Sequence, residues 1–143
     1  MIAVIDYGVG NMFSLCSSLK YIGADVTVTS DAGQIRKADR IILPGVGAFA
    51  DAIDKLRSKG LDKVIKEEAA AGKDMMGICL GMQLLFDRSF EYGEHSGLGL
   101  VSGQVVDLRN DLTDKTLKVP HMGWNSLQIQ KSDPLFRYFR DGE

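Results

Sequence analysis

Cys79 is the residue of this sequence whose surroundings most resemble those of a nucleophile. It lies in the stretch "DMMGICLGMQLLF" (74–86), with Gly77 two positions before it and Gly81 two positions after it. This spacing is typical of a nucleophile elbow, a tight strand-to-helix turn in which small neighbours tolerate a strained backbone. A cysteine that only packs in a core needs no such glycines. We therefore predict that Cys79 is a nucleophile held out at such a turn.

The same turn predicts how the sulfur is activated. A helix that begins at Cys79 presents free N–H groups and the positive end of its dipole, and both favour the thiolate over the thiol. The N–H group of Leu80 is placed to hold the oxyanion of a tetrahedral intermediate. The other cysteine, Cys16, lies on the apolar stripe of a helical pattern, so we expect it in the core.

The elements that must position Cys79 follow from the hydrophobic pattern. Short apolar runs predict strands, helical spacing predicts helices between them, and the two alternate. The expected strands are 2–6, 25–29, 40–47 and 74–78, and the expected helices are 12–22, 49–56, 61–68 and 79–85. Such an alternation indicates an α/β fold, a mostly parallel open sheet with helices on both faces and ligands at the carboxyl ends of its strands.

The sequence changes character from about residue 98. The runs "GLGLVSGQVVDL" and "WNSLQIQ" are longer and more polar than the earlier strands, so we expect a smaller antiparallel or mixed portion there. Near the end, Asp133 as a cap and Pro134 at the first helical position predict the start of a helix.

Composition excludes several classes of protein. The net charge of −2 gives no electrostatic reason to expect nucleic acid or an anionic membrane as a partner. No apolar run approaches the roughly 18 residues of a membrane span, and the start does not resemble a signal peptide. Two cysteines without secretion signals indicate reduced thiols and a cytoplasmic location. The two histidines and two cysteines lack the spacing of a metal site, and no cofactor is expected.

Four motifs carry a resemblance to a known family. "GICLGMQ" (77–83) resembles the cysteine motif of class I (triad) glutamine amidotransferases, which release ammonia from glutamine. "DYGVGN" (6–11), "PGVG" (44–47) and "PHMGWN" (120–125) are similar, in order along nearly the whole chain, to the glutaminase subunits of imidazole glycerol phosphate synthases. The resemblance implies glutamine as substrate and a barrel-shaped cyclase subunit as partner. That subunit uses the ammonia to form imidazole glycerol phosphate and an aminoimidazole carboxamide ribotide in histidine synthesis.

The resemblance also implies roles for individual residues. Cys79 would attack the side-chain amide of glutamine and form a γ-glutamyl thioester. Leu80 would give one oxyanion N–H group, and Val46 the other if its peptide rotates, which the flanking glycines ease. The implied contacts to bound glutamine are Gly47, Gln83 and Glu91. The residue types alone would favour a polar helix-face position for Gln83 and a solvated loop acid for Glu91.

The family places one further set of residues at the contact with the cyclase subunit. These residues are Asn11, His121, Met122, Trp124 and Asn125. Trp124 could instead be a core residue that buries a large apolar area. Tryptophan and methionine are also common interface anchors, and we favour the interface.

The acid–base pair of the family has no counterpart in the sequence. Ammonia release and thioester hydrolysis need an acid and a base, which the family takes from a histidine and a glutamate two positions later. His121 belongs to "PHMGWN", and His95 falls in a predicted surface loop. We expect a single amidotransferase domain over 1–143 that is incomplete at its C-terminus, lacks the C-terminal strands and turns over glutamine slowly. Two alternatives stay open: a non-catalytic docking module of the same fold, and a class I amidotransferase that serves another acceptor.

Overall fold

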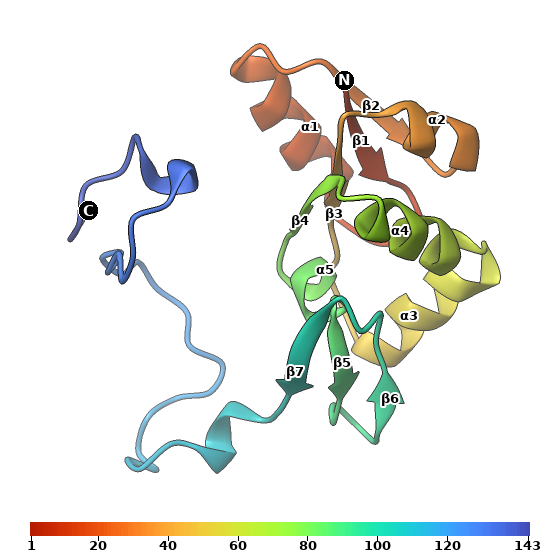
Figure 1. Ribbon diagram of the computed structural model, residues 1–143. Helices are drawn as coiled ribbons and strands as arrows, with labels where there is room; N and C mark the ends of the chain where they lie inside the picture. Colours follow the sequence, from red (N-terminus) through yellow and green to blue (C-terminus); the bar gives the residue numbers. More distant parts are fainter. The chain divides into compact units, whose positions relative to one another are not determined.

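A parallel sheet forms the centre of the first part of the chain. The computed structural model describes residues 1–143 as two compact units, Met1–Asp107 and Leu108–Glu143. The strands of the first unit lie in the order β2-β1-β3-β4, and every neighbouring pair is parallel (Figure 1). They are β1 (Ile2–Ile5), β2 (Val26–Thr29), β3 (Arg40–Leu43) and β4 (Asp74–Gly77). The predicted α/β fold class is confirmed.

Helices cover both faces of this sheet, as the alternating pattern predicts. They are α1 (Met12–Tyr21), α2 (Ala32–Lys37), α3 (Phe49–Ser58) and α4 (Leu61–Ala70). Helix α1 lies on one face, and α2, α3 and α4 lie on the other (Figure 1). Sequence reasoning missed α2, although its start carries a signal. The Asp31 carboxylate accepts a hydrogen bond from the Gln34 N–H at 2.8 Å, and an acidic cap followed three residues later by Gln resembles a capping box.

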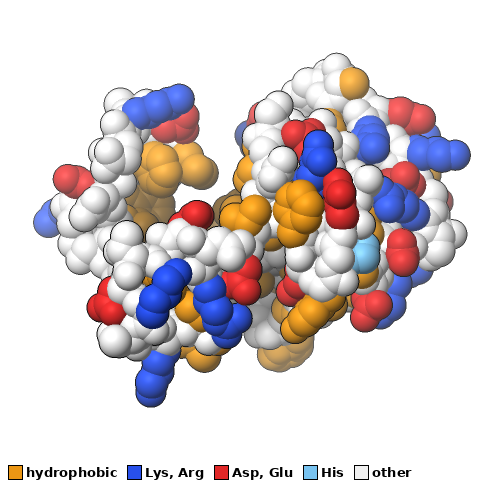
Figure 2. All heavy atoms as spheres, turned by 90° about the horizontal axis from the view of Figure 1, so that it is seen from below, with side chains coloured by type: hydrophobic (Ala, Val, Ile, Leu, Met, Phe, Trp, Pro, Cys, Tyr) orange, Lys and Arg blue, Asp and Glu red, His pale blue; other side chains and the backbone are white.

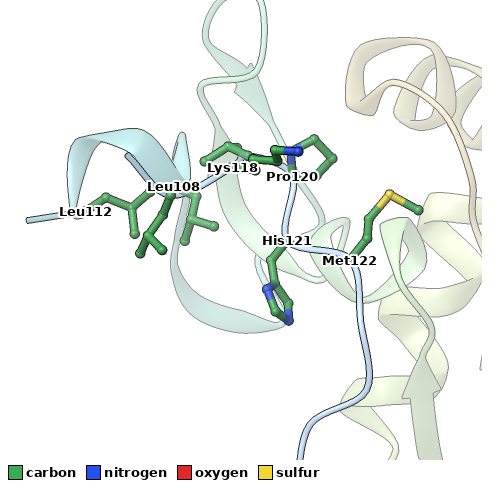
Figure 3. Close-up of a pocket in the computed structure, with 8 residues that line it drawn as sticks. Leu108, Leu112, Lys118, Pro120, His121 and Met122 are labelled. Carbon is green, nitrogen blue, oxygen red and sulfur yellow. The ribbon is translucent and has the colours of Figure 1, made fainter. Parts of the chain in front are cut away.

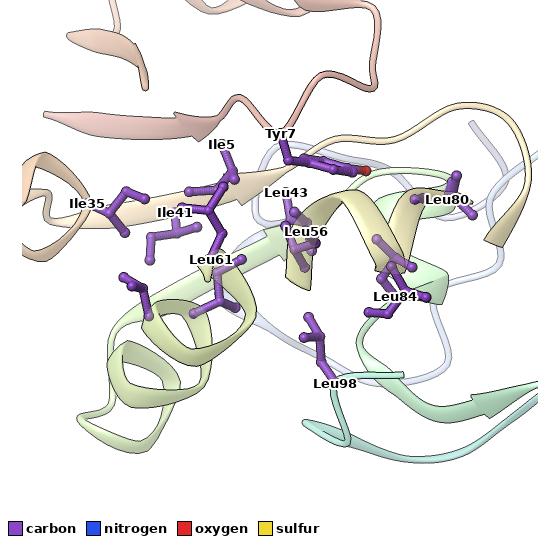
Figure 4. Packing of buried hydrophobic residues seen from close by; sticks show 14 of the residues in the cluster. Ile5, Tyr7, Ile35, Ile41, Leu43, Leu56, Leu61, Leu80, Leu84 and Leu98 are labelled. Carbon is purple, nitrogen blue, oxygen red and sulfur yellow. The ribbon is translucent and has the colours of Figure 1, made fainter. Parts of the chain in front are cut away.

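The main core lies between the sheet and the α2–α4 layer. Apolar side chains from β1, β3, α3 and α4 interdigitate there and continue to the elbow region through Leu80, Leu84 and Leu98 (Figure 4). Burial of such side chains stabilises a fold by about 1.5–3 kcal/mol each. The apolar residues of the strands therefore determine which face of the sheet packs against α3 and α4.

The opposite face is less completely covered. Helix α1 packs mainly against the edge strand β2 and has no fully buried residue. Cys16 is consequently half-buried on α1, and the prediction that it is a core residue is wrong. Strand β4 is the other edge of the sheet, so its residues are exposed or half-buried rather than fully buried as expected.

A second, smaller sheet follows α5 (Leu80–Gln83). Its strands β5 (Phe86–Ser89), β6 (His95–Ser96) and β7 (Val101–Val105) lie in the order β6-β5-β7. Strand β5 pairs antiparallel with β6 and parallel with β7. The predicted mixed portion is therefore confirmed for this part of the chain.

The second unit, Leu108–Glu143, contains two short 3-10 helices, η1 (Leu108–Asn110) and η2 (Pro134–Phe136). Asp133 accepts a hydrogen bond from the Leu135 N–H at 2.9 Å, which confirms the predicted cap, although the turn is 3-10 and not α-helical. The strand expected at 124–130 is wrong: that stretch has no strand. Leu127 instead exchanges backbone hydrogen bonds with Gly142 and Glu143.

The longest helices of the chain have ten residues. None of its helices combines the length and the apolar content that crossing a bilayer requires.

Candidate active site

Cys79 lies at the end of β4 in a backbone conformation that few residues adopt. Its φ is 54° and its ψ is −118°, a region that costs a non-glycine residue about 1–3 kcal/mol. The side chain is exposed to solvent. This is the geometry of a nucleophile elbow, and it excludes the interpretation of Cys79 as a buried packing residue.

The two flanking glycines are required by close backbone approach. A Cβ on Gly81 would stand 1.9 Å from the Leu43 carbonyl oxygen, and a Cβ on Gly77 would stand 2.4 Å from the Cα of Met82. Both distances are far below van der Waals contact, and the opposing atoms are backbone. The chain can therefore turn from β4 into α5 against the end of β3 only with glycine at these positions.

The elbow leaves the backbone amide of Leu80, which follows the nucleophile, without a partner. The N–H groups of Gly81 and Met82 donate to the carbonyl oxygens of Ile78 and Cys79, each at 3.0 Å, whereas the N–H of Leu80 makes no hydrogen bond. The helix that follows is shorter than expected, since α5 has four residues. The helix dipole that acts on the Cys79 sulfur is therefore that of a single turn. The free N–H of Leu80 is the main feature that favours negative charge beside the sulfur.

Cys79 opens onto a hollow of about 280 Å³. Its lining comes from the end of β3 and the following turn, from the elbow and from the first turns of α1: Pro44, Gly45, Val46, Ile78, Cys79, Asn11, Ser14, Leu15 and Ser18. Val46 and Cys79 are thus brought together as predicted. The hollow has no histidine and no carboxylate in its lining, and Gly47, Gln83 and Glu91 do not contribute to it.

The three residues expected to contact glutamine lie near the elbow in different settings. Gln83 is half-buried at the end of α5, and its N–H donates to the Cys79 carbonyl oxygen at 3.2 Å. Gly47 has a φ of +96° and open space where a side chain would be. Glu91 follows β5, and its Oε2 accepts a hydrogen bond from the Phe49 N–H at 2.7 Å. Glu91 is therefore attached to the start of α3 and is not a freely solvated loop acid.

Tyr7 is a residue of this region that sequence reasoning missed. Its side chain is fully buried, and its hydroxyl donates to the Pro44 carbonyl oxygen at 2.7 Å. Burial raises the pKa of Tyr7 to about 12, so the hydroxyl remains a donor at neutral pH. The available signal was topological: Tyr7 and Pro44 follow strands that a parallel sheet places side by side.

We expected His95 in a surface loop. It lies instead in strand β6, where it pairs with Ser89. Its Nε2 atom is buried and has no hydrogen-bond partner. His95 is half-buried and belongs to a paired strand, so the loop prediction is wrong. His95 does not line the hollow beside Cys79.

The expected interface residues divide between the two units. In the first unit, Asn11 is exposed and caps α1, with its side-chain oxygen 3.2 Å from the Ser14 nitrogen. In the second unit, Trp124 and Met122 are exposed, so Trp124 is not part of a core formed by residues 1–143. The side chains of His121 and Asn125 are hydrogen-bonded to each other, with 2.7 Å between Nε2 and Nδ2.

A hollow of about 680 Å³ lies within the second unit (Figure 3). It is lined by residues between Leu108 and Met122, including the beginning of the "PHMGWN" stretch. Figure 3 shows the side chains of His121 and Met122 leaving the chain in different directions. None of the predicted catalytic or glutamine-contacting residues belongs to this hollow.

Charged side chains of both signs are interspersed on the face of the molecule in Figure 2. Hydrophobic side chains also reach that surface. The mixed signs agree with the small net charge of −2.

The fold and the elbow together define a class: an α/β protein that presents a cysteine nucleophile at the carboxyl edge of a parallel sheet. Comparison with known families assigns the chain within this class. The model of the family "Glutamine amidotransferase class-I" matches residues 3–142. The chain belongs to the class I glutamine amidotransferase family, as its cysteine motif predicts.

Curated relatives are about 50% identical to this chain over the aligned residues. The imidazole glycerol phosphate synthase subunit HisH of Sulfurimonas denitrificans is 49% identical over 95% of this chain and 65% of its own length. The protein of the same name from Oceanobacillus iheyensis is 51% identical over 95% of this chain and 65% of its own length. That of Caldanaerobacter subterraneus is 48% identical over 100% of this chain and 68% of its own length. The chain thus spans about 65% of the length of the first two relatives.

Solved structures support the fold. A crystal structure of a glutamine amidotransferase superposes with a TM-score of 0.65 and 19% identity, over 80% of this chain and 60% of that chain. A putative peptidase E protein from Listeria monocytogenes superposes with a TM-score of 0.59 and 20% identity, over 70% of this chain and 62% of that chain. At these identities the likeness concerns the architecture.

Proposed function

We propose that this protein is the glutaminase subunit of an imidazole glycerol phosphate synthase. The observation that carries the proposal is the exposed thiol of Cys79 at a strained elbow, next to the unpaired N–H of Leu80. The names of relatives that are about 50% identical support the assignment. The substrate would be glutamine, and the ammonia would pass to a barrel-shaped cyclase subunit for histidine synthesis.

The chemistry would begin with attack by the Cys79 thiolate on the side-chain amide carbon of glutamine. A C–S bond forms, and the electron pair of the C=O bond moves to the oxygen, where the N–H groups of Leu80 and Val46 would hold it. When the C=O bond re-forms, the C–N bond breaks, and the nitrogen leaves as ammonia after it gains a proton. Water then adds to the thioester carbon and releases glutamate and the thiol.

The proton transfers need groups outside the hollow beside Cys79, because its lining offers neither an imidazole nor a carboxylate. Residues 1–143 would thus contribute the nucleophile and the oxyanion donors of the reaction. We expect glutamine turnover by these residues alone to be slow, because an acid–base group typically contributes about 100- to 10,000-fold to the rate.

Binding of glutamine would involve the side chains around the elbow. Glu91 offers a carboxylate for the α-ammonium end of glutamine, and Gln83 offers a polar amide nearby. Gly47 leaves room for the substrate, because no side chain occupies its position. The cyclase subunit would dock on Asn11 and on the "PHMGWN" residues His121, Met122, Trp124 and Asn125. The exposed Trp124 and Met122 are of the residue types that anchor interfaces.

Alkylation by the chloroketone analogue of L-glutamine tests the active-site assignment directly. The sulfur forms a C–S bond at the methylene carbon, and chloride leaves with the electron pair of the C–Cl bond. We expect a single adduct on Cys79, formation that glutamine slows, no adduct in Cys79→Ser, and normal labelling in Cys16→Ser. Labelling at Cys16, or labelling of Cys79 that glutamine does not slow, would contradict a glutaminase site.

A further inference from the structure

The turn from β3 to α3, residues 44–48, contains Val46 and forms one wall of the hollow beside Cys79. Its first residue is held firmly. The buried Tyr7 hydroxyl donates to the Pro44 carbonyl oxygen at 2.7 Å. A Cβ on the next residue, Gly45, would stand 2.7 Å from the Gly81 nitrogen and 2.8 Å from the Tyr7 hydroxyl. This end of the turn is therefore pressed against the elbow, and Tyr7 forms part of the wall that holds it there.

The far end of the turn is held by a different side chain. Helix α3 begins at Phe49, and its cap residue Ala48 has no side chain that could satisfy the helix N–H groups. The Glu91 carboxylate takes that place by accepting the Phe49 N–H at 2.7 Å. Glu91 is itself oriented by Ser89, a buried residue whose hydroxyl oxygen lies 3.1 Å from the Glu91 nitrogen and accepts its N–H.

Between these two anchors the backbone N–H groups have no partner. The N–H groups of residues 45–48 make no hydrogen bond. Val46 is about half exposed, and Gly47 has a positive φ and nothing within 4 Å of its missing Cβ. The Val46 peptide can therefore rotate without breaking a backbone hydrogen bond.

We propose that Tyr7 and Glu91 are positioning residues that fix the two ends of the 44–48 turn, so that the Val46 peptide can rotate toward the oxyanion while the turn itself stays in place. This inference rests on the proposed glutaminase function and goes beyond it, because neither residue need touch the reacting atoms for this role. It predicts that loss of the Tyr7 anchor slows the covalent step and leaves the binding of the glutamine portion unchanged. Loss of the Glu91 anchor should also slow the covalent step, separately from any contact that Glu91 makes with glutamine.

The chloroketone analogue of L-glutamine separates these two effects. The Cys79 thiolate first adds to the ketone carbon, and the electron pair of the C=O bond moves to the oxygen at the oxyanion position. The sulfur then shifts from this carbon to the methylene carbon as chloride leaves and the C=O bond re-forms. The maximal alkylation rate kinact therefore reports on the oxyanion donors, and the half-saturating concentration KI reports on binding. We expect Tyr7→Phe to lower kinact about tenfold with KI unchanged, since small displacements of catalytic groups cost up to about 100-fold. Iodoacetamide has no glutamine portion, and its rate with Cys79 should stay the same.

Tyr21→Phe is the matched control, because the Tyr21 side chain is exposed on α1 and makes no hydrogen bond. It should leave kinact and KI unchanged. At the second anchor, Glu91→Ala should lower kinact, and Glu91→Gln should recover most of the loss, because its amide oxygen can still accept the Phe49 N–H. A rise in KI for Glu91→Gln would show in addition that the carboxylate binds the substrate ammonium.

The possible outcomes separate the two proposals. If the wild-type protein reacts with the chloroketone and Tyr7→Phe reacts at the same kinact, the anchoring role is overturned and the glutaminase site stands. If Tyr7→Phe changes the unfolding free energy alone, the hydrogen bond to Pro44 is structural and the inference fails. If the wild-type Cys79 does not react with the chloroketone, the proposed function fails, and the positioning role fails with it.

Discussion

Gly81 lies so close to Leu43 that a Cβ on the glycine would stand 1.9 Å from the leucine carbonyl oxygen. That oxygen cannot move aside easily, because it accepts the Ile78 N–H at 3.0 Å. The end of β3 and the cysteine turn after β4 are therefore in direct backbone contact. The contact explains why the second glycine of the motif is needed by the fold itself, before any chemistry is considered.

We expect Gly81→Ala to be strongly destabilising. The added methyl group overlaps the Leu43 backbone, and overpacking against atoms that cannot relax costs about 3 kcal/mol or more. Urea unfolding would measure the free energy, and chloroketone labelling would report whether the elbow survives. Gly123→Ala is a suitable control, because no atom lies within 4 Å of that position and its φ is not in the left-handed region. Equal stability of Gly81→Ala and the wild type would contradict the close approach.

The strain at Cys79 predicts a comparison between two inactive variants. Cys79→Gly and Cys79→Ala both remove the sulfur, but glycine adopts a φ of 54° without strain. The relieved strain of about 1–3 kcal/mol exceeds the extra backbone entropy of about 0.5–1 kcal/mol that glycine loses on folding. Cys79→Gly should therefore unfold with a free energy about 1 kcal/mol higher than that of Cys79→Ala. The reverse order would show that the elbow is unstrained.

Local sequence patterns were sufficient to predict the elements around the nucleophile. The apolar runs after Met1, Asp25 and Lys37 are strands of the sheet, and the glycine spacing around Cys79 predicted the elbow. These features are encoded within a few residues, by hydrophobic period or by a required φ. The short helix α2 was missed because it contributes only one fully buried residue, Ile35.

Contacts between distant segments could not be read in the same way. The bond from Tyr7 to Pro44 spans 37 residues and that from Phe49 to Glu91 spans 42, and no local pattern pairs them. The stretch 124–130 was predicted wrongly for a related reason. Its composition is strand-like, but no strand pairs with it and it is irregular. Strand propensity reflects the surroundings more than the backbone, so such a segment is decided by what it packs against.

Burial of Tyr7 predicts a loss of stability in alkaline solution. Its pKa rises from 10.0 to about 12 on folding, so the folded state holds the phenol proton more tightly than the unfolded state. This contribution to stability is complete below the unfolded pKa and disappears as the pH rises through the folded one. Between about pH 8 and about pH 11 the wild type should lose about 1.4 kcal/mol that Tyr7→Phe does not lose. Parallel pH profiles of the two proteins would contradict burial of an ionisable hydroxyl.

Trp124 provides the sharpest test of the proposed docking surface, because its side chain is fully exposed in the second unit. Its replacement by alanine removes no internal packing, so the free energy of unfolding should change by less than about 0.5 kcal/mol. Interface tryptophans often act as hot spots, and binding to the cyclase subunit should weaken by about 2 kcal/mol or more. Isothermal titration with the cyclase subunit would measure the loss. Tyr138→Ala is the control, as this residue is also exposed in the second unit but lies outside "PHMGWN". If both variants bind equally well, the cyclase subunit docks elsewhere; if Trp124→Ala unfolds easily, the side chain packs within the protein and anchors nothing outside it.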